Sequence, residues 1–521
     1  MAVRDWMLTV EERRNTHAWI DRGRPGDEGW SEGNQVRPLV HGATYFAQLL
    51  EDLRALGKGD QVYLADWRGD PDELLDGPGS AVGIELARAA SAGARVYGLI
   101  WRSHLDRLRM SSAENRMLSE VVNNFGGNLL LDQRVRRIGS HHQKFVVIRH
   151  PDRPADDVAF VGGIDLSHSR NDSADHHGDP RAQPMAKVYG PTPPWHDVQV
   201  EIRGPAVADV ETCFRERWSD PAPLRQLHPW MYVSDRIRGD RVKVSKLPDQ
   251  LPAPPVAGEH TVQLLRTYPS HSPKYPFAPL GERSVALGYR KAIGRAERLI
   301  YLEDQFLWSG EVAQVFADAL RRAPELRLIA VVPRHCDRDG FSAEQSTGLT
   351  HREALHEIHE AGGDRVTIVD VENHAGTPVY VHAKVCVVDD TWAAVGSANL
   401  NMRSWTHDSE LTAAVLDASG DGTGYARGLR LQLMAEHLDR TAEDVADLVD
   451  PISAAETARA AALALDDWWA AGRTGERPPG RLRWHHIPEV ERGTTFWGPL
   501  MNNLVNDPDG RPFGWRRAGR W

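Results

Sequence analysis

Two stretches of the chain place a histidine and a lysine two residues apart at an apolar run that is typical of a β-strand. They are His142 with Lys144 and His382 with Lys384. Side chains two residues apart point to the same face of a strand, so each stretch would present an imidazole and an ammonium group together. Two lysines that have no acidic partner need an anion, and phosphate is the natural one. The repetition therefore predicts one phosphate site built from two similar parts.

Imidazole chemistry suits the displacement of an alcohol from a phosphodiester. Because histidine titrates near neutral pH, one imidazole can attack phosphorus while the other, protonated, donates to the leaving oxygen. The reaction then runs in two steps through a phosphohistidine. The lysines can hold the developing negative charge, so we expect no metal and no cofactor. The residues alone leave open which histidine attacks.

Each histidine–lysine pair is followed by a glycine turn with polar residues. The second turn, residues 396–399, offers Ser397 and Asn399 as further ligands of the phosphate. In the first turn, residues 161–165, Asp165 takes the place of Asn399 and would either cap the turn or bind a substrate group. Asp389 is a candidate support for the second turn.

Two acids are candidates to fix the tautomer and orientation of the histidines, as carboxylates do in other imidazole catalysts. Asp197 and Glu410 each begin an apolar, alternating strand that follows a glycine turn. Asp408 is a weaker rival of Glu410. The candidate catalytic residues are therefore His142, Lys144, His382, Lys384, Asp197 and Glu410.

The strands that must position these residues recur in both halves of the chain. Residues 61–67 and 299–305 are expected to form buried strands, and each is followed by a helical stretch and another strand, at 95–101 and 327–332. Tyr63 precedes His142 by 79 residues (142 − 63), and Tyr301 precedes His382 by 81 (382 − 301). The chain thus carries one internal duplication rather than a short repeat.

Strands rich in Val, Ile and Leu that alternate with helices indicate an α/β protein. We expect two similar halves, each a mixed, largely parallel β-sheet flanked by helices, packed as a pseudo-dimer with the active site at the interface. The predicted divisions are an N-terminal extension (1–35), a first half (36–235), a Pro-rich linker (236–258), a second half (259–440) and a helical, Trp-rich tail (441–521).

The tail holds four tryptophans of special interest, Trp484, Trp497, Trp515 and Trp521. Aromatic side chains of this kind pack well across a seam between domains, and a membrane interface is the alternative. We expect the tail to pack on the core. His168, His176 and His177 lie in a polar loop at 167–194, which we expect to form the rim of the pocket rather than a metal site.

The motifs resemble those of the phospholipase D superfamily, whose signature, His-x-Lys-(x)4-Asp, occurs in two copies. The second copy, from His382 to Asp389 with the turn 396–399, fits it fully. The first copy resembles the eukaryotic type in residues 141–144, 160–166 and 194–197, and the resemblance covers residues 36–437. One departure is Arg149, which stands where the first aspartate would be; Asp152, Asp156 and Asp157 follow it as candidate substitutes.

The resemblance implies roles that the residues alone do not decide. It implies that His142 is the nucleophile and His382 the general acid. It also implies that the supporting acids cross over, with Glu410 behind His142 and Asp197 behind His382.

The expected activity is that of a phospholipase D, a phosphodiesterase that hydrolyses phosphatidyl head groups to phosphatidic acid, with transfer to an added alcohol. The alternatives are a phosphatidyltransferase such as a cardiolipin or phosphatidylserine synthase, a metal-independent nuclease, and an inactive module that binds anionic lipids. The net charge of −11 weighs against nucleic acid as a partner. We expect a monomer whose partner is phospholipid at a membrane or micelle surface; the head group stays open.

The chain of 521 residues has no run of 18 apolar residues, so no transmembrane helix is expected. Its first residues lack the pattern of a secretion signal. We therefore expect a cytoplasmic protein or one peripheral to a membrane, with secretion of a processed form as the alternative.

Overall fold

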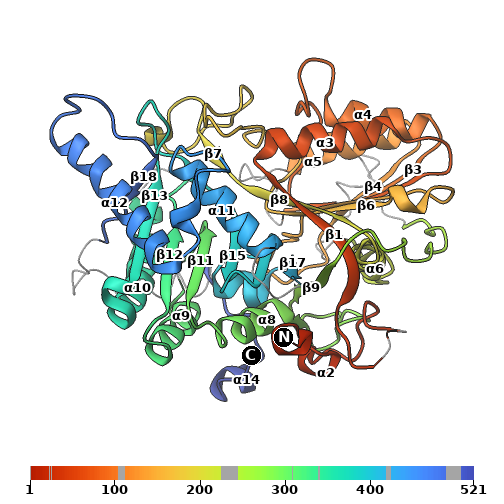
Figure 1. Cartoon of the computed structure of the whole chain (residues 1–521). Coiled ribbons are helices and arrows are strands. Elements are labelled where there is room, and N and C mark those ends of the chain that lie inside the picture. Colours follow the sequence, from red (N-terminus) through yellow and green to blue (C-terminus); the bar gives the residue numbers. More distant parts are fainter. Residues whose placement is uncertain are drawn as a thin grey trace.

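A computed structural model describes the fold (Figure 1). The described residues are 2–22, 24, 26–103, 112–224, 244–307, 309–337, 341–417, 424–487 and 506–521. The predicted boundary at 235/236 and Trp497 lie outside them. Within the described part of the chain, no helix is long and apolar enough to cross a bilayer.

The first half is a mixed sheet covered on one face by helices. Three strands run parallel, β2 (Gln61–Asp66), β3 (Arg95–Trp101) and β4 (Asn128–Asp132). The remaining pairs are antiparallel and extend from β2 through β5 (Phe145–Arg149), β6 (Val158–Gly162) and β8 (Val198–Arg203) to β1 (Ser31–Val40). The helices α3 (Gly42–Arg54), α4 (Val82–Ser91) and α5 (Ser112–Asn124) cover it (Figure 1).

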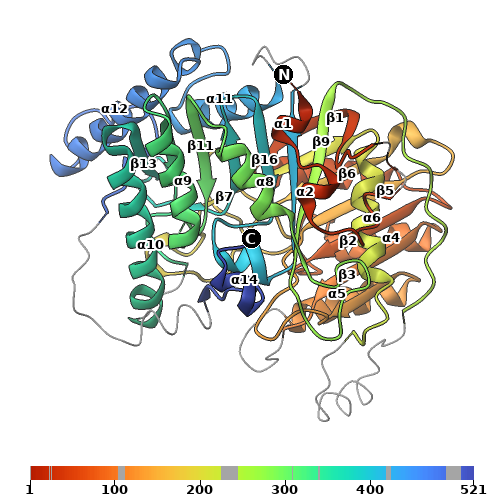
Figure 2. The same ribbon diagram turned by 90° about the horizontal axis from the view of Figure 1, so that it is seen from below.

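The second half repeats this pairing strand for strand. The parallel strands are β11 (Leu299–Asp304), β12 (Arg327–Val331) and β13 (Val366–Val371). The antiparallel series runs from β11 through β15 (Lys384–Val388), β16 (Trp392–Gly396) and β17 (Glu410–Leu416) to β9 (His260–Tyr268). The helices α8 (Ser284–Ile293), α9 (Gly310–Arg322) and α10 (Phe341–Gly362) lie along its outer side (Figure 2).

The α/β class and the duplication are confirmed, but the sheets are less parallel than the sequence suggested. Each half has two parallel pairings, and the others are antiparallel. The reason is the short return after each His-x-Lys strand: residues 150–157 join β5 to β6, and residues 389–391 join β15 to β16. Connections this short favour antiparallel neighbours, since a parallel crossover needs a dozen or more residues.

The two halves share one core and one sheet. Among the described residues, 16 strands form a continuous sheet, joined edge to edge where β1 pairs with β9. Side chains alternate along the central strands: Val147 and Val387 belong to a core common to both halves, whereas Val146 and Cys386 face the helices of their own half. Helices α6 (Ala206–Trp218) and α11 (Tyr425–His437) contribute to the shared core.

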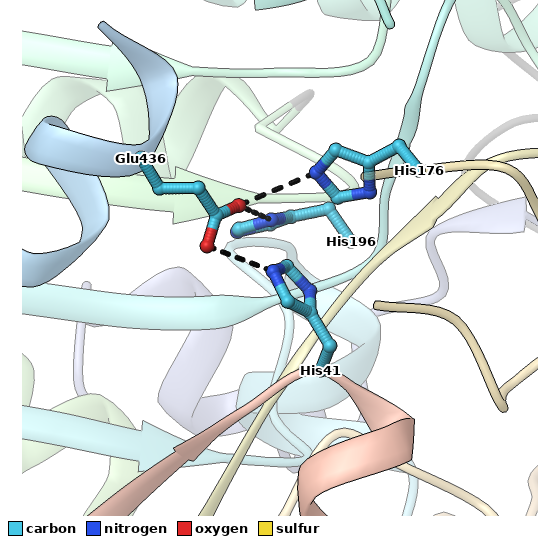
Figure 3. Close-up of side chains that lie close together, drawn as sticks. All are labelled: His41, His176, His196 and Glu436. Carbon is cyan, nitrogen blue, oxygen red and sulfur yellow. Dashed lines mark hydrogen bonds and ion pairs between the residues drawn. The ribbon is translucent and has the colours of Figure 1, made fainter. Parts of the chain in front are cut away.

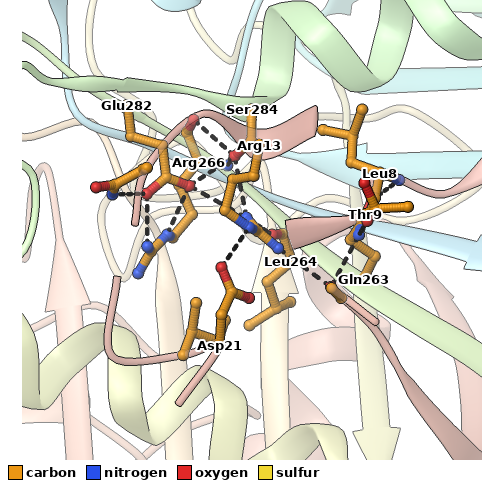
Figure 4. A network of polar contacts seen from close by, with 12 residues as sticks. Leu8, Thr9, Arg13, Asp21, Gln263, Leu264, Arg266, Glu282 and Ser284 are labelled. Carbon is orange, nitrogen blue, oxygen red and sulfur yellow. Dashed lines mark hydrogen bonds and ion pairs between the residues drawn. The ribbon is translucent and has the colours of Figure 1, made fainter. Parts of the chain in front are cut away.

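The N-terminal segment packs on the second half before the chain enters the first. Helices α1 (Val3–Trp6) and α2 (Val10–Arg13) lie beside α8 in both views (Figures 1 and 2). The fully buried Arg13 lies 3.0 Å from Asp21 and 3.1 Å from Glu282, and it donates to the Leu264 carbonyl at 2.9 Å (Figure 4). Arg266 binds Glu282 from the other side at 2.6 Å.

The tail packs on the core through several contacts. After α12 (Pro451–Ala470), strand β18 (Leu482–Trp484) pairs with the edge strand β13. The buried Trp521 lies 5.4 Å from Trp405, measured between ring centroids. The carbonyl of Gly510 accepts a hydrogen bond of 2.7 Å from Arg136 of the first half. The tail therefore contacts both halves, while the exact domain divisions stay a prediction.

The substitution Arg13→Ala should lower the free energy of unfolding by about 3–5 kcal/mol, because it leaves the buried side chain of Asp21 without its cation and takes one of two cations from Glu282. Equilibrium unfolding in urea measures the change. The matched control is Arg22→Ala: Arg22 is exposed and lies over the Trp19 ring at 5.2 Å, so its loss should cost less than about 1 kcal/mol. Equal losses in the two variants would contradict the structural role given to Arg13.

Candidate active site

His142 lies at the entry to β5 and is held by the second half. Its backbone N–H donates to the carbonyl of Ser409 at 2.9 Å. Its ring Nδ1 lies 2.9 Å from one carboxylate oxygen of Glu410 and 3.1 Å from the other. The Glu410 side chain is fully buried, whereas the ring of His142 is 15% exposed. The hydrogen bond therefore fixes Nδ1 and leaves Nε2, on the opposite side of the ring, directed away from the acid.

His382 repeats the arrangement with the halves exchanged. Its backbone N–H donates to the carbonyl of His196 at 2.7 Å, and Nδ1 lies 2.6 Å from Asp197. A short parallel pairing of β14 (Tyr380–Val381) with β7 (Trp195–His196) aligns the two segments. The acids thus cross over between the halves, as the resemblance implied.

The two lysines are buried beside these histidines. Lys144 donates to the carbonyl of His142 at 3.0 Å and lies 3.3 Å from Asp165. Lys384 donates to the carbonyl of His382 and, at 3.2 Å, to Gln305. The expectation that the lysines lack an acidic partner is therefore wrong for Lys144, since the first glycine turn brings Asp165 back to it.

Burial tunes the titrating groups around His382. It lowers the pKa of His382 well below its usual range, and the positive charges of Lys384 and Arg170 add to the effect. It raises the pKa of Asp197 to about 6, although the Lys384 ammonium opposes the rise. It lowers the pKa of Lys384 to about 8, against the pull of Asp197 and Asp304.

Asp165 acts as a fixed anion in the first glycine turn. Besides Lys144, it binds Arg170 at 3.0 Å. Burial works to raise the pKa of Asp165, but Lys144 and Arg170 outweigh it and hold that pKa well below its usual range. In the second turn Asn399 lines the cleft and carries no charge, so the two turns differ in charge although their backbones correspond.

Ser397 does not face the cleft as a ligand of phosphate, contrary to the sequence interpretation. It is fully buried, and its hydroxyl donates to Glu410 at 2.5 Å. Ser397 therefore fixes the carboxylate that in turn holds His142. Asp408, the rival of Glu410, accepts hydrogen bonds from the N–H and hydroxyl of Ser140 at 2.9 and 2.8 Å, and Nε of Arg403 donates to it at 2.7 Å; it takes no part in orienting His142.

Asp389 and Arg149 lie at the far ends of their strands. Asp389 accepts hydrogen bonds from the backbone N–H groups of residues 297–299, at 2.8–2.9 Å, and so anchors the start of β11. Arg149 is buried and binds Asp157 at 2.8 Å, and Asp157 also accepts from the N–H of His150. Of the three candidate substitutes, Asp157 is the one that contacts Arg149.

Sequence reasoning missed Asp66 and Asp304, which end strands β2 and β11. Each carboxylate accepts from the backbone of the glycine turn of its own half, Leu166 at 3.0 Å and Leu400 at 2.9 Å. Burial raises the pKa of Asp304 to about 7 and, together with the neighbouring Asp165, raises the pKa of Asp66 well above its usual value. Their matching places in the two repeats were the signal that could have identified them.

The two histidines open into one large cleft with a volume of about 2230 Å³. Its walls combine apolar and aromatic side chains with arginines. The lining includes Trp67, Trp101, Met185, Trp195, Phe306, Tyr380, Arg68, Arg134, Arg170 and Arg403. His168 lines the cleft, as expected for the rim loop, but His176 is fully buried and does not line the cleft, and His177 is exposed.

Comparisons with known proteins agree with this geometry. The family model "Phospholipase D" matches residues 115–315, and "Cardiolipin synthase, PLD-like domain" matches residues 289–420. Phospholipase D alpha 1 of Zea mays is 24% identical over 86% of this chain and 70% of its own length; that of Cynara cardunculus is 26% identical over 72% and 62%.

A relative from Arabidopsis thaliana, phospholipase D beta 2, is 26% identical, and this chain spans only 44% of its length. Among solved structures, the phosphatidylserine synthase of Haemophilus influenzae Rd KW20 shares the fold, with a TM-score of 0.52 and 14% identity over 77% of this chain and 85% of that one. The duplicated histidine–lysine motifs lie within the matched regions. The chain belongs to the phospholipase D superfamily.

Proposed function

We propose that the protein is a phospholipase D, which hydrolyses the head-group phosphodiester of a phospholipid to phosphatidic acid. Membership of the superfamily supports a phosphodiesterase or phospholipid-modifying enzyme. The observation that carries the finer proposal is the pair of crossed hydrogen bonds, from His142 to Glu410 and from His382 to Asp197. They leave two Nε2 atoms and two buried lysines to act on one bound phosphate.

In the first step His142 is the nucleophile. Because its Nδ1–H is held by Glu410, Nε2 carries the lone pair that attacks phosphorus. A P–N bond forms, the bond from phosphorus to the head-group oxygen breaks, and His382 gives its Nε2 proton to that oxygen. The products are the head-group alcohol and a phosphatidyl group on His142.

In the second step His382 acts as the base. It takes a proton from water, the water oxygen attacks phosphorus, and the P–N bond breaks to release phosphatidic acid and free His142. An alcohol that reaches the same position would replace water and give a new phosphatidyl ester. Transphosphatidylation therefore shares every residue with hydrolysis.

The charges around His382 favour proton uptake when substrate enters. Burial and the cations near the ring keep the pKa of His382 low. A phosphodiester brings a negative charge among Lys144, Lys384 and Arg170, which offsets these cations and raises the affinity of His382 for a proton. The lysines then stabilise the charge that develops on the phosphoryl oxygens.

Lipid is favoured over nucleic acid by the cleft and by the overall charge. Trp67 stacks on Trp101 with centroids 5.6 Å apart, and both line the cleft. Ile138, also in the lining, is 53% exposed, and Phe513 is 69% exposed on α14 (Phe513–Arg517), whose Arg516 reaches the cleft. Such side chains suit contact with a membrane or micelle surface, and the net charge of −11 does not suit a polyanion.

Phosphatidyl transfer is the second candidate function. It is favoured by the match of residues 289–420 to the family described as cardiolipin synthase, PLD-like domain. The same phosphatidyl-enzyme would then be resolved by the hydroxyl of a second lipid or of an amino acid instead of water.

Release of choline, ethanolamine or serine from mixed phospholipid vesicles tests the proposal, with ethanol added to one set and plasmid DNA as a parallel substrate. We expect phosphatidic acid from lipid, phosphatidylethanol when ethanol is present, and intact DNA. His382→Ala should lower the rate by about 10²–10⁴-fold. His374→Ala, which alters an exposed histidine paired with Asp439, should leave it unchanged. Cleavage of DNA alone would overturn the proposal.

Binding of an oxyanion should weaken as the pH rises through the pKa of Lys384, which is about 8. Below that pH the ammonium is charged and attracts the anion; above it the amine is neutral. Sulfate keeps its charge throughout, so calorimetry should show its affinity falling about tenfold from pH 7 to pH 9. Lys384→Met should bind sulfate weakly with no such fall. The same fall in that variant would mean that another group titrates.

A further inference from the structure

A cluster of three histidines and one glutamate lies buried at the junction of the halves, outside the lining of the cleft. His41 caps the start of α3, His176 comes from the rim loop, His196 lies in β7, and Glu436 lies in α11 (Figure 3). The histidines are at most 3% exposed, and the glutamate side chain is 13% exposed. We call these four residues the histidine cluster.

The donor atoms of the histidine cluster converge on one point. One carboxylate oxygen of Glu436 lies 2.8 Å from Nε2 of His41; the other lies 3.3 Å from Nε2 of His176 and 3.6 Å from Nδ1 of His196 (Figure 3). The four ligand atoms lie within 4.8 Å of one another. In a tetrahedral zinc site with bonds of about 2.0–2.1 Å, ligand atoms are about 3.4 Å apart, so only a small contraction is needed.

The outer nitrogens of two of these rings are already anchored. Nε2 of His196 lies 2.6 Å from Glu303, and Nδ1 of His176 lies 3.2 Å from the carbonyl of Trp195. Carboxylates and carbonyls hold the outer N–H of metal-bound histidines in this way. Glu303 also accepts from Tyr301 at 2.5 Å and contacts His437 at 2.8 Å, so it is an outer acceptor rather than a further ligand.

This anchoring creates an electrostatic conflict that a cation would relieve. With each outer N–H donated outward, His176 and His196 turn lone pairs toward the same oxygen of Glu436, which has only lone pairs of its own. Neither inner nitrogen, nor that oxygen, has a hydrogen-bond partner among the described residues. Buried polar atoms are rarely left in this state, and either a metal ion or a proton must lie between them.

The backbone is strained at two of the ligands. His41 has φ 69° and ψ 159°, a region that is essentially restricted to glycine, and His176 has φ 53°. Strain of this kind persists where the surroundings demand a given side-chain position, as in ligand clamps.

We propose that His41, His176, His196 and Glu436 bind one divalent transition-metal ion, zinc being the best fit, in a closed structural site. Imidazole and carboxylate suit zinc, and four protein ligands leave no open position for substrate. The ion would join three residues of the first half to α11 of the second. It would also fix the backbone at His196, whose carbonyl holds His382 and whose neighbour is Asp197. This site does not depend on the proposed function.

The test uses the full chain, purified without chelator and with any affinity tag removed. Elemental analysis should find one zinc ion per chain. After removal of the metal, added cobalt should give the intense visible bands of a tetrahedral site, and added zinc should raise the thermal unfolding temperature. His176→Ala and Glu436→Gln should each lose the ion, whereas the surface control His374→Ala should keep it.

Three outcomes would overturn the proposal. In the first, the purified chain contains well below one zinc ion, cobalt gives no tetrahedral spectrum, and added zinc does not change the thermal unfolding temperature. A shared proton would then lie between the inner nitrogens and Glu436. Another is an ion retained equally by His176→Ala, which places it elsewhere. The third is a cobalt spectrum typical of six oxygen ligands. The cobalt spectrum and the thermal unfolding temperature are measured on the unaltered chain. These two measurements therefore still decide the question if a variant fails to fold.

Discussion

The structure depends on two hydrogen bonds that cross between its halves, from His142 to Glu410 and from His382 to Asp197. Neither half supplies both members of either pair, so these two hydrogen bonds exist only where the halves meet. The edge pairing of β1 with β9 and the shared core hold the two halves in a fixed relative position. Arg13 contributes from the N-terminal segment by linking it to the second half.

The duplication gives the two halves equivalent backbone positions around the site, and the side chains at those positions differ. Asp66 and Asp304 fix the two glycine turns in the same way, through Leu166 and Leu400. The turns themselves present Asp165 on one side and the neutral Asn399 on the other. With Arg170 added to the first side, the cleft is electrostatically asymmetric, which suits a division between a nucleophile and an acid better than two identical halves would.

The sequence predicted the α/β class, the duplication and the two histidines that line the cleft, because strand periodicity and repeated spacing are local signals. It could not show that Ser397 turns inward to Glu410 or that Asp165 returns to Lys144, since each contact depends on how a turn closes. The histidine cluster was beyond its reach for the same reason: its members span from His41 to Glu436, and His176 looked like part of a polar rim. Fewer parallel pairings than expected followed from the short turns after the His-x-Lys strands.

In the proposed mechanism His142 takes the phosphatidyl group and His382 moves the protons. The sharpest test uses His382→Ala and a phosphatidyl ester of p-nitrophenol that is radiolabelled in its phosphatidyl group, because nitrophenolate leaves without needing a proton. We predict a burst of one nitrophenolate per chain, then a stall, with the label on His142 after peptide mapping, because the second step lacks its base. Label on another residue, or steady turnover without a labelled histidine, would contradict the account.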